Sequence, residues 1–219
     1  MSVTGIYDGF ISRHINRRFS EPLAKLLAGT PMTPNQATWL AFGIAVISGV
    51  VFASGFNIVG GILAQLSSIA DGVDGGLARR KKMTSDFGGF LDSVLDRYAD
   101  AAIIMGLSAW SLSHEAYYPG GWAVGFAALA GTFAVSYSRA RIAPEQRLHF
   151  DRGLASVASR DVRLFVIMLG GLTGQAYLCL AAIAIMTNAA VLYRLYWSYR
   201  NLALAQRHPP SQTASEQPR

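Results

Sequence analysis

The chain has 219 residues, of which 52% are hydrophobic and only 15% are charged, against about 25% charged in an average soluble protein. This composition excludes a disordered or a nucleic-acid-binding polypeptide, and the formal net charge of +6 comes from basic residues that lie between apolar segments. Residues 26–70 run for 45 positions without Asp, Glu, Lys or Arg, whereas a membrane-crossing helix needs about 20 apolar residues. The sequence therefore predicts an integral membrane protein.

The first predicted element is a basic amphipathic helix within residues 1–30, which we expect to lie in the membrane surface. Its apolar and basic side chains recur at helical spacing, as Phe10, Ile11, Ile15, Phe19, Leu23, Leu26 and Leu27 with Arg13, Arg17 and Lys25 between them. Pro31 and Pro34 end this helix. Because the segment has no continuous apolar core, we expect it to stay in the mature protein and not to be a signal peptide.

Six transmembrane helices are predicted over residues 31–203, followed by a polar, disordered tail over residues 204–219. Their approximate bounds are 35–56, 58–79, 87–113 and 121–141, and the last pair shares the uncharged stretch 164–193 with a turn at Gly170, Gly171 and Gly174. With a cytoplasmic N-terminus, this count places all 19 Lys and Arg on the inner side and leaves Glu115 as the one formal charge outside. We expect an all-α, multi-pass protein of the cytoplasmic membrane with both termini in the cytoplasm.

Four aspartates occur in the second and third apolar segments. Asp71 and Asp74 are three residues apart, so they lie on one face of a helix. Asp92 and Asp96 are four apart, and consecutive antiparallel helices can bring the two faces together. A carboxylate at the centre of a membrane helix costs about 2.5 to 3.5 kcal/mol on insertion scales, so four of them need a compensating cation. Oxygen-only ligands favour Mg²⁺ or Mn²⁺.

Glycines and an arginine accompany these aspartates. Gly72, Gly75 and Gly76 lack side chains beside two of the carboxylates, which would let a ligand approach the helix backbone. The alternative is that they allow close helix packing, and both uses can hold at once. Arg79 is suited to a phosphate, so that metal, glycines and arginine together indicate a pyrophosphate ligand. The alternative, in which the aspartates only pair with arginines, is less favoured because buried carboxylates are expensive. Asp100 continues the same stripe, and we interpret it as structural.

This segment resembles the signature of the CDP-alcohol phosphotransferases: Asp-Gly-x-x-Asp-Gly-x-x-Ala-Arg, eight residues, then Gly-x-x-x-Asp-x-x-x-Asp. Every fixed position is filled, by Asp71, Gly72, Asp74, Gly75, Ala78, Arg79, Gly88, Asp92 and Asp96. The signature covers residues 71–96. The pattern of six spans after a surface helix extends the resemblance over about 200 residues.

The resemblance implies a role for each aspartate. Asp71, Asp74 and Asp92 would hold the metal, and Asp96 would complete a second metal site, so two ions are expected. Asp96 would also be the base that takes the proton of the acceptor hydroxyl. The donor would be a CDP-linked alcohol, the leaving group CMP, and the enzyme a homodimer. The family's donor-binding positions map onto Asn35, Thr38, Asp71, Gly75, Arg79 and Ser85.

Two arginine-rich stretches bear on the acceptor. Arg139 and Arg141 end the fourth span, and Arg160 and Arg163 begin the fifth, so all four are predicted at the cytoplasmic side. Guanidinium groups bind phosphate by paired hydrogen bonds, and we therefore expect an acceptor that carries its own phosphate. The alternative is that these arginines only anchor the helices at the membrane interface.

Two resemblances within the family suggest different substrates. Residues 136–141 are similar to members that use inositol phosphate or glycerol phosphate, such as phosphatidylinositol-phosphate synthase. Residues 159–165 look more like di-myo-inositol-phosphate-phosphate synthases, whose donor is the soluble CDP-inositol. Those enzymes are often fused to a cytidylyltransferase domain that these 219 residues do not contain. The donor therefore stays open between CDP-diacylglycerol and CDP-inositol.

Other functions remain as alternatives. A phosphatidylglycerophosphate-type synthase would use glycerol phosphate as its acceptor. A divalent-cation transporter could also use intramembrane carboxylates. The transporter has no use for Arg79 beside the acidic residues, whereas a pyrophosphate site does, so the enzyme is favoured.

Overall fold

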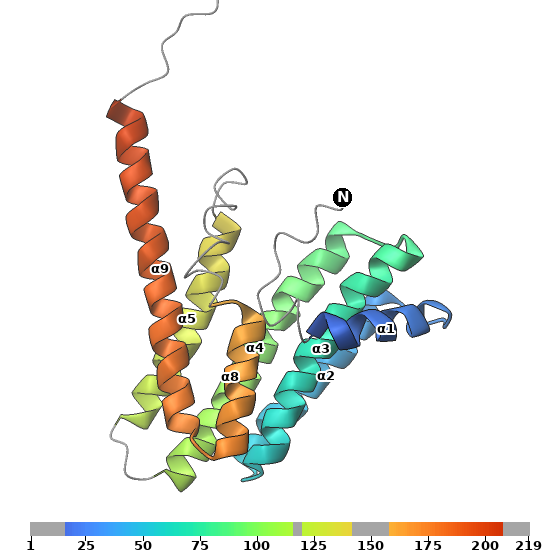
Figure 1. Ribbon diagram of the computed structural model, residues 1–219, viewed down its shortest axis with the longest axis horizontal. Helices are drawn as coiled ribbons and strands as arrows, with labels where there is room; N and C mark the ends of the chain where they lie inside the picture. Colours follow the sequence, from blue (N-terminus) through green and yellow to red (C-terminus); the bar gives the residue numbers. More distant parts are fainter. Residues whose placement is uncertain (1–15, 116–119, 142–157, 208–219) are drawn as a thin grey trace, which may run out of the picture.

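The computed structural model describes residues 16–115, 120–141 and 158–207. Within these ranges the chain forms seven α-helices and no strand, which confirms the all-α class. The helices are α1 (Arg17–Ala28), α2 (Pro34–Ala53), α3 (Asn57–Lys81), α4 (Asp86–His114), α5 (Gly121–Arg141), α8 (Arg160–Thr173) and α9 (Ala176–Arg207). Figure 1 shows α2 to α9 as a bundle of helices side by side, with α1 lying across it.

Local sequence explains several helix ends. Thr33 caps α2 in a capping box: its side chain accepts a hydrogen bond from the Gln36 N–H, and the Gln36 side chain accepts one from the Thr33 N–H. Ser85 caps α4, because its Oγ accepts a hydrogen bond of 3.0 Å from the Gly88 N–H. Gly174 ends α8 with a left-handed φ of 67°. This is the turn that the glycines of the last pair predicted.

The described helices differ in how well they suit a membrane. Two of them, α2 and the 176–200 part of α9, are long and apolar enough to cross one. Helices α3 and α4 have 25 and 29 residues but carry the aspartates. Helix α8 has 14 residues, about 21 Å of length against a hydrocarbon core of about 30 Å. Helix α9 continues to Arg207, four residues into the stretch predicted as a disordered tail.

Glycines allow the backbones of neighbouring helices to touch. Helix α2 packs against both α3 and α4. A Cβ on Gly49 of α2 would overlap the carbonyl oxygen of Ala102, and a Cβ on Gly106 of α4 would overlap that of Gly49. Where α3 meets α8, a Cβ on Gly171 would lie 3.0 Å from the Cα of Gly61. These contacts fix the helices that carry the aspartates relative to α2.

Helix α1 covers part of α3. Gly72 and Gly76 face Ser20 and Ala24 of α1, and a Cβ on Gly76 would lie 2.8 Å from that of Ala24. Of the two alternatives for these glycines, the structure shows close helix packing: Gly72 and Gly76 allow α1 to approach α3. Of the three glycines in question, Gly75 lines a pocket.

The outer side of α1 is apolar. Phe19, Leu23 and Leu26 are exposed there, at 58%, 43% and 71%. Glu21 pairs with Arg80 of α3 at 2.6 Å and ties this helix to the bundle. The predicted apolar positions Phe10, Ile11 and Ile15, and the basic Arg13, lie outside the described residues.

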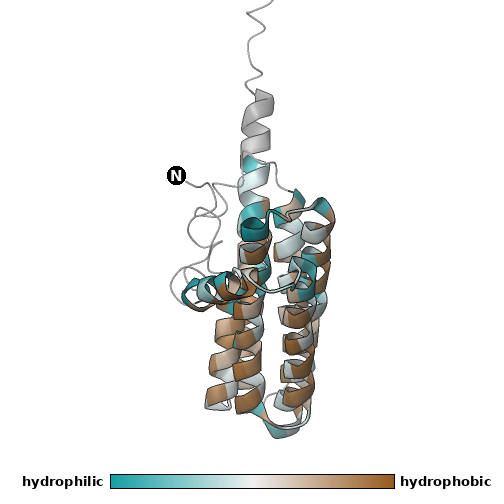
Figure 2. Cartoon of the chain, turned by 90° about the vertical axis from the view of Figure 1, so that its right-hand side faces the viewer, coloured by the Kyte–Doolittle hydropathy of each residue, from teal (hydrophilic) through white to brown (hydrophobic). Residues whose placement is uncertain are grey.

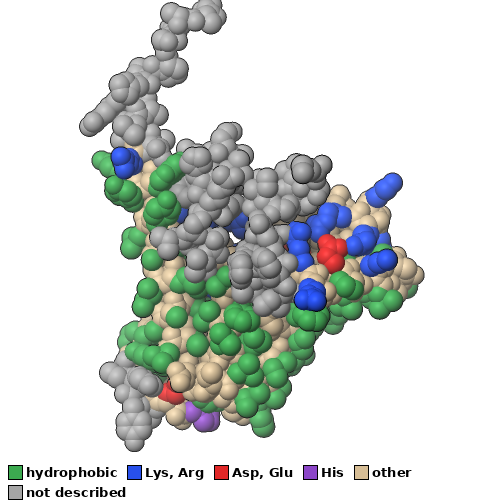
Figure 3. Space-filling model, in the orientation of Figure 1, with side chains coloured by type: hydrophobic (Ala, Val, Ile, Leu, Met, Phe, Trp, Pro, Cys, Tyr) green, Lys and Arg blue, Asp and Glu red, His purple; other side chains and the backbone are tan. Residues whose placement is uncertain are grey.

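Basic side chains gather at one end of the bundle. Helix α3 ends there at Lys81, α5 ends there at Arg141, and α8 begins there at Arg160. Figure 3 shows the Lys and Arg side chains on the upper part of one face, above a mostly apolar lower part. Figure 2 shows the same division by hydropathy. The turn at the opposite end carries His114 and Glu115. This is the charge distribution expected of a membrane protein whose basic end faces the cytoplasm.

Candidate active site

Three of the four signature aspartates come together. One carboxylate oxygen each of Asp71, Asp92 and Asp96 lies within 4.8 Å of the others. Asp71 comes from α3, and the other two are one helical turn apart on α4. We call these three residues the acidic cluster. Their side chains are half-buried, and three carboxylate oxygens at such separations fit a hard divalent cation.

Asp74 follows Asp71 by about one turn of α3, and its side chain contacts α2. Its Oδ2 accepts a hydrogen bond of 2.6 Å from the Thr38 Oγ1, and its Oδ1 accepts one from the Gly75 N–H. Thr38 also donates to the Pro34 carbonyl oxygen at 3.2 Å, so its hydroxyl is shared between the two acceptors. Asp74 is therefore held beside the acidic cluster and is not one of its three members.

A pocket of about 210 Å³ opens between the start of α2, the end of α3 and the start of α4. Its lining residues are Pro34, Asn35, Thr38, Asp74, Gly75, Ala78, Arg79, Met83, Thr84, Ser85, Gly88, Gly89 and Asp92. Five of the six residues predicted to bind the donor are among them: Asn35, Thr38, Gly75, Arg79 and Ser85. The sixth, Asp71, belongs to the acidic cluster. Because Asp92 belongs to both groups, the pocket adjoins the cluster.

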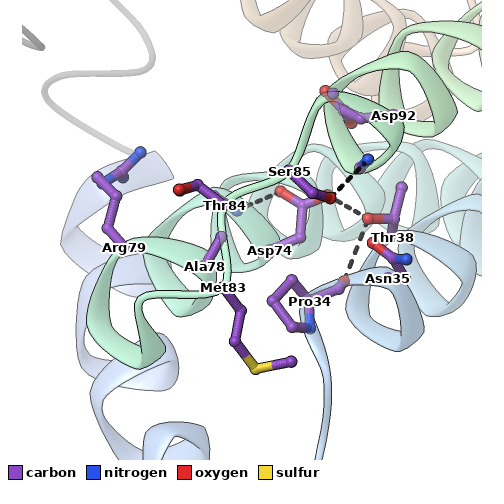
Figure 4. A pocket seen from close by; sticks show the side chains of 13 residues that line it. Pro34, Asn35, Thr38, Asp74, Ala78, Arg79, Met83, Thr84, Ser85 and Asp92 are labelled. Atoms are coloured by element: carbon purple, nitrogen blue, oxygen red, sulfur yellow. Dashed lines mark hydrogen bonds between the residues drawn. The ribbon is translucent and has the colours of Figure 1, made fainter.

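The pocket wall suits a large anionic group. Figure 4 shows Arg79 and Asp92 on opposite sides of Asp74, with Asn35 and Thr38 below Asp92. At the start of α4 the wall is bare backbone, since a Cβ on Gly89 would meet nothing within 4 Å. An exposed guanidinium at one side and carboxylates at the other can hold a phosphate next to a bound cation.

Arginines of α8 complete the surroundings of the acidic cluster. The Arg160 Nη1 lies 2.8 Å from the Asp71 Oδ1 and 2.9 Å from the Asp96 Oδ1, and its Nε lies 3.2 Å from the Asp100 Oδ1. Arg163 is 3% exposed. Its Nη2 donates to the Asp100 Oδ2 at 2.8 Å, and its Nη1 donates to the Ala158 carbonyl oxygen at 2.8 Å.

The four arginines predicted to bind an acceptor phosphate differ in position. Arg139 and Arg141 are exposed at the end of α5. Arg160 reaches the acidic cluster, whereas Arg163 is buried and has both terminal nitrogens engaged by protein acceptors. Sequence reasoning missed that Asp100 is the shared partner of the two α8 arginines. Its one signal was the place of Asp100 on the aspartate stripe, one turn after Asp96.

Comparison with known proteins identifies the family of this chain. Residues 31–195 match the model of the family described as CDP-alcohol phosphatidyltransferase. The chain belongs to this family. That confirms the resemblance carried by the signature over residues 71–96.

Two curated relatives show the range within the family. The chain is 43% identical over 188 residues to a bifunctional IPC transferase and DIPP synthase of Rubrobacter xylanophilus, which covers 86% of this chain and 42% of the relative. It is 32% identical over 185 residues to an archaetidylinositol phosphate synthase of Pyrococcus horikoshii, which covers 84% of this chain and 93% of the relative. The chain spans less than half the length of the bifunctional relatives it matches.

The fold also matches solved structures. A phosphatidylinositol phosphate synthase of Mycobacterium tuberculosis with CDP-DAG bound superposes with a TM-score of 0.63 at 21% identity, over 82% of this chain and 92% of that one. The same enzyme in complex with manganese and citrate gives a TM-score of 0.56 at 24% identity, over 81% and 88%. At these identities the likeness concerns the arrangement of the helices.

Proposed function

We propose that this chain is a metal-dependent CDP-alcohol phosphotransferase. It would move a substituted phosphoryl group from a CDP-linked alcohol to a hydroxyl of a phosphorylated polyol and release CMP. The observation that carries this proposal is the shared wall of the pocket and the acidic cluster at Asp92. A pyrophosphate bound in the pocket would lie against carboxylates that fit a divalent cation.

The acidic cluster would hold the metal. Asp71, Asp92 and Asp96 offer an all-oxygen ligand set, which suits Mg²⁺ or Mn²⁺. Asp74, which lines the pocket together with Asp92, would be the fourth ligand of a two-ion site. A bound ion would neutralise the pyrophosphate and the charge that develops on the departing CMP. The solved relative with manganese supports a divalent ion in this fold.

The chain's own residues would carry the remaining work. Asn35, Thr38, Gly75 and Ser85 would line the donor, with Arg79 on its phosphate oxygens. Asp96 would take the proton of the acceptor hydroxyl. The hydroxyl oxygen then bonds to the phosphorus distal to cytidine, the bond from that phosphorus to CMP breaks, and CMP leaves with the electron pair.

The acceptor that we propose is an inositol phosphate, with glycerol phosphate as the second candidate. Support comes from the relatives, whose names include archaetidylinositol phosphate synthase and phosphatidylinositol phosphate synthase. Arg139, Arg141 and Arg160 would bind the acceptor's phosphate. Arg163 would contribute indirectly, because it holds Asp100 and, through Asp100, the side chain of Arg160.

We further propose that the chain crosses the membrane six times, with α1 on the cytoplasmic surface, both termini in the cytoplasm, and a homodimer as the working unit. The basic end of the bundle supports this orientation. The exposed apolar side of α1, at Phe19, Leu23 and Leu26, supports contact with lipid.

The decisive experiment measures CMP release by the purified protein in detergent with Mg²⁺. CDP-diacylglycerol and CDP-inositol serve as donors, and inositol phosphate, glycerol phosphate, inositol and serine as acceptors, with Asp96→Asn as the control. CMP from one pair, lost in the control, identifies the substrates. Binding of CDP and metal without CMP release would refute these acceptors. A protein that binds metal but no nucleotide would favour the cation transporter instead.

A further inference from the structure

Arg160 lies between carboxylates that fit a divalent cation. Its Nη1 contacts Asp71 at 2.8 Å and Asp96 at 2.9 Å, so one nitrogen bridges two of the three members of the acidic cluster. A cation bound to carboxylate oxygens sits about 2.0 to 2.6 Å from them. The guanidinium nitrogen and such an ion therefore exclude each other from the same two oxygens.

Asp100 gives Arg160 a second contact that lies deeper in the protein. The Arg160 Nε is 3.2 Å from the Asp100 Oδ1, and the Asp100 Oδ2 is fixed by Arg163 at 2.8 Å. Asp100 is 2% exposed. Because Nε is closer to the backbone than Nη1, the end of the side chain can leave the acidic cluster while the Nε contact keeps it nearby.

The charges around the cluster favour such an exchange. Among the described residues, two guanidinium groups contact carboxylates of the acidic cluster, those of Arg160 and Arg97, and both also contact Asp100. The acidic cluster is therefore short of positive charge. With Arg160 turned away, the attraction for a cation at the acidic cluster increases.

We propose that Arg160 is an internal counter-cation. It holds Asp71 and Asp96 together in the metal-free protein, and a divalent cation must displace its Nη1 in order to bind, while Asp100 retains the side chain at the site. The inference rests on the proposed metal site and deepens it. Arg160 is thus a positioning residue before the metal arrives, and its guanidinium becomes free for an acceptor phosphate only afterwards.

The test measures Mn²⁺ binding to the full chain by electron paramagnetic resonance, in detergent and without nucleotide or acceptor. Arg160→Gln removes the charge and keeps a hydrogen-bonding side chain. We expect this variant to bind Mn²⁺ at least about tenfold more tightly and to unfold at a lower temperature than wild type in EDTA. Unchanged or weaker Mn²⁺ binding overturns the inference. An unchanged unfolding temperature in EDTA also overturns it, because Arg160 then does not hold the cluster together.

Arg97→Gln is the matched control for a general loss of positive charge. The Arg97 Nη2 contacts Asp96 at 3.3 Å and Asp100 at 3.8 Å, both on its own helix α4. The ion pairs of the described residues include no contact of Arg97 with Asp71, so Arg97 does not bridge α3 and α4 as Arg160 bridges Asp71 and Asp96. An equal gain of Mn²⁺ affinity in Arg97→Gln and Arg160→Gln would mean that the loss of one positive charge explains the gain. That result would refute the displacement of the Arg160 Nη1 by the cation. A smaller gain for Arg97→Gln supports it.

A second variant covers the case in which Arg160→Gln does not fold. Arg160→Lys keeps the charge, but one ammonium group cannot reach Asp71, Asp96 and Asp100 at once, so tighter Mn²⁺ binding is again expected and unchanged binding contradicts the inference. The two proposals fail differently. A wild-type protein that binds no Mn²⁺ refutes the metal site, whereas a wild type that binds Mn²⁺ and releases CMP, with variants no tighter, refutes only the role of Arg160.

Discussion

Asp96 and Asp100 are one turn apart on the same helix and both contact Arg97 and Arg160, but Asp100 also has the buried Arg163 as a partner. Asp100 is 2% exposed, and its two oxygens are held by Arg160 and Arg163. Asp96 is 18% exposed, shares Arg160 with Asp71 and lies among other carboxylates. The difference comes from α8, which brings a buried arginine to one aspartate only. A buried carboxylate whose negative charge is neutralised by the protein's own arginines has a structural role. A carboxylate with too little positive charge around it can bind a cation.

The largest effect is expected at the unbalanced aspartate. Asp96→Asn removes the proposed base and the negative charge of one carboxylate of the acidic cluster, so the rate of CMP release should fall by about 10² to 10⁴. Asp86→Asn is the matched control, because Asp86 is exposed at the start of the same helix and lies outside the signature. More than a tenth of the wild-type rate in Asp96→Asn would exclude Asp96 from the reaction.

The balanced aspartate should affect stability instead. Asp100→Asn leaves the buried guanidinium of Arg163 without its charged partner, and breaking a buried pair in this way costs about 3 to 5 kcal/mol. Unfolding of the purified variant in EDTA, followed by circular dichroism, measures the loss. Wild-type stability would show that Arg163 does not depend on Asp100, and the contrast between the two aspartates would disappear.

Arg79→Ala tests nucleotide binding in the pocket separately from metal binding at the acidic cluster. Loss of a charge-assisted hydrogen bond of about 1.5 to 3 kcal/mol predicts CDP binding weaker by about 10- to 150-fold. Mn²⁺ binding should stay at the wild-type level, since Arg79 lines the pocket and makes no contact with Asp71 or Asp96 that the described residues show. Isothermal titration with CDP provides the measurement. Lys82→Ala, an exposed residue just after α3, is the control, and equal CDP affinity in both variants would contradict a donor pocket here.

The smallest effect is expected for Arg97→Gln. Arg97 is 30% exposed and contacts Asp96 and Asp100 at 3.3 and 3.8 Å, so its removal should cost about 1 kcal/mol or less. Thermal unfolding side by side with Asp100→Asn gives the comparison. A loss as large as that of Asp100→Asn would mean that Arg97, and not Arg163, balances Asp100.

Local patterns predicted much of the helical framework, whereas the residues of the donor site came from the family resemblance. Helix α5 begins at Gly121 and ends at Arg141, where hydropathy and charge placed the fourth span. Ser85, which the family resemblance placed in the donor site, lines the pocket and also caps α4. Such features depend on residues within one or two helical turns, which is why a single sequence contains them.

Contacts between distant segments could not be predicted in this way. Gly72 and Gly76 are as suitable for a ligand as for a helix, and only the position of α1 decides between the two. The pairing of Arg160 and Arg163 with Asp100 is a similar case, because the two arginines are about sixty positions from the aspartate in the sequence. Periodicity identifies the face of a helix on which a residue lies, but not the helix that packs against that face.

Gly49 and Gly106 have a consequence for how variants of this protein are judged. Gly106 follows Asp96 by ten residues, about 15 Å along α4, yet a Cβ at either glycine would overlap backbone, which cannot turn aside as a side chain can. In a library of single substitutions selected by growth, these glycines would tolerate change as poorly as Asp96. Loss of growth would then result either from a lost catalytic group or from a lost helix contact between α2 and α4. Measuring the amount of folded protein together with the rate of CMP release would distinguish the two causes.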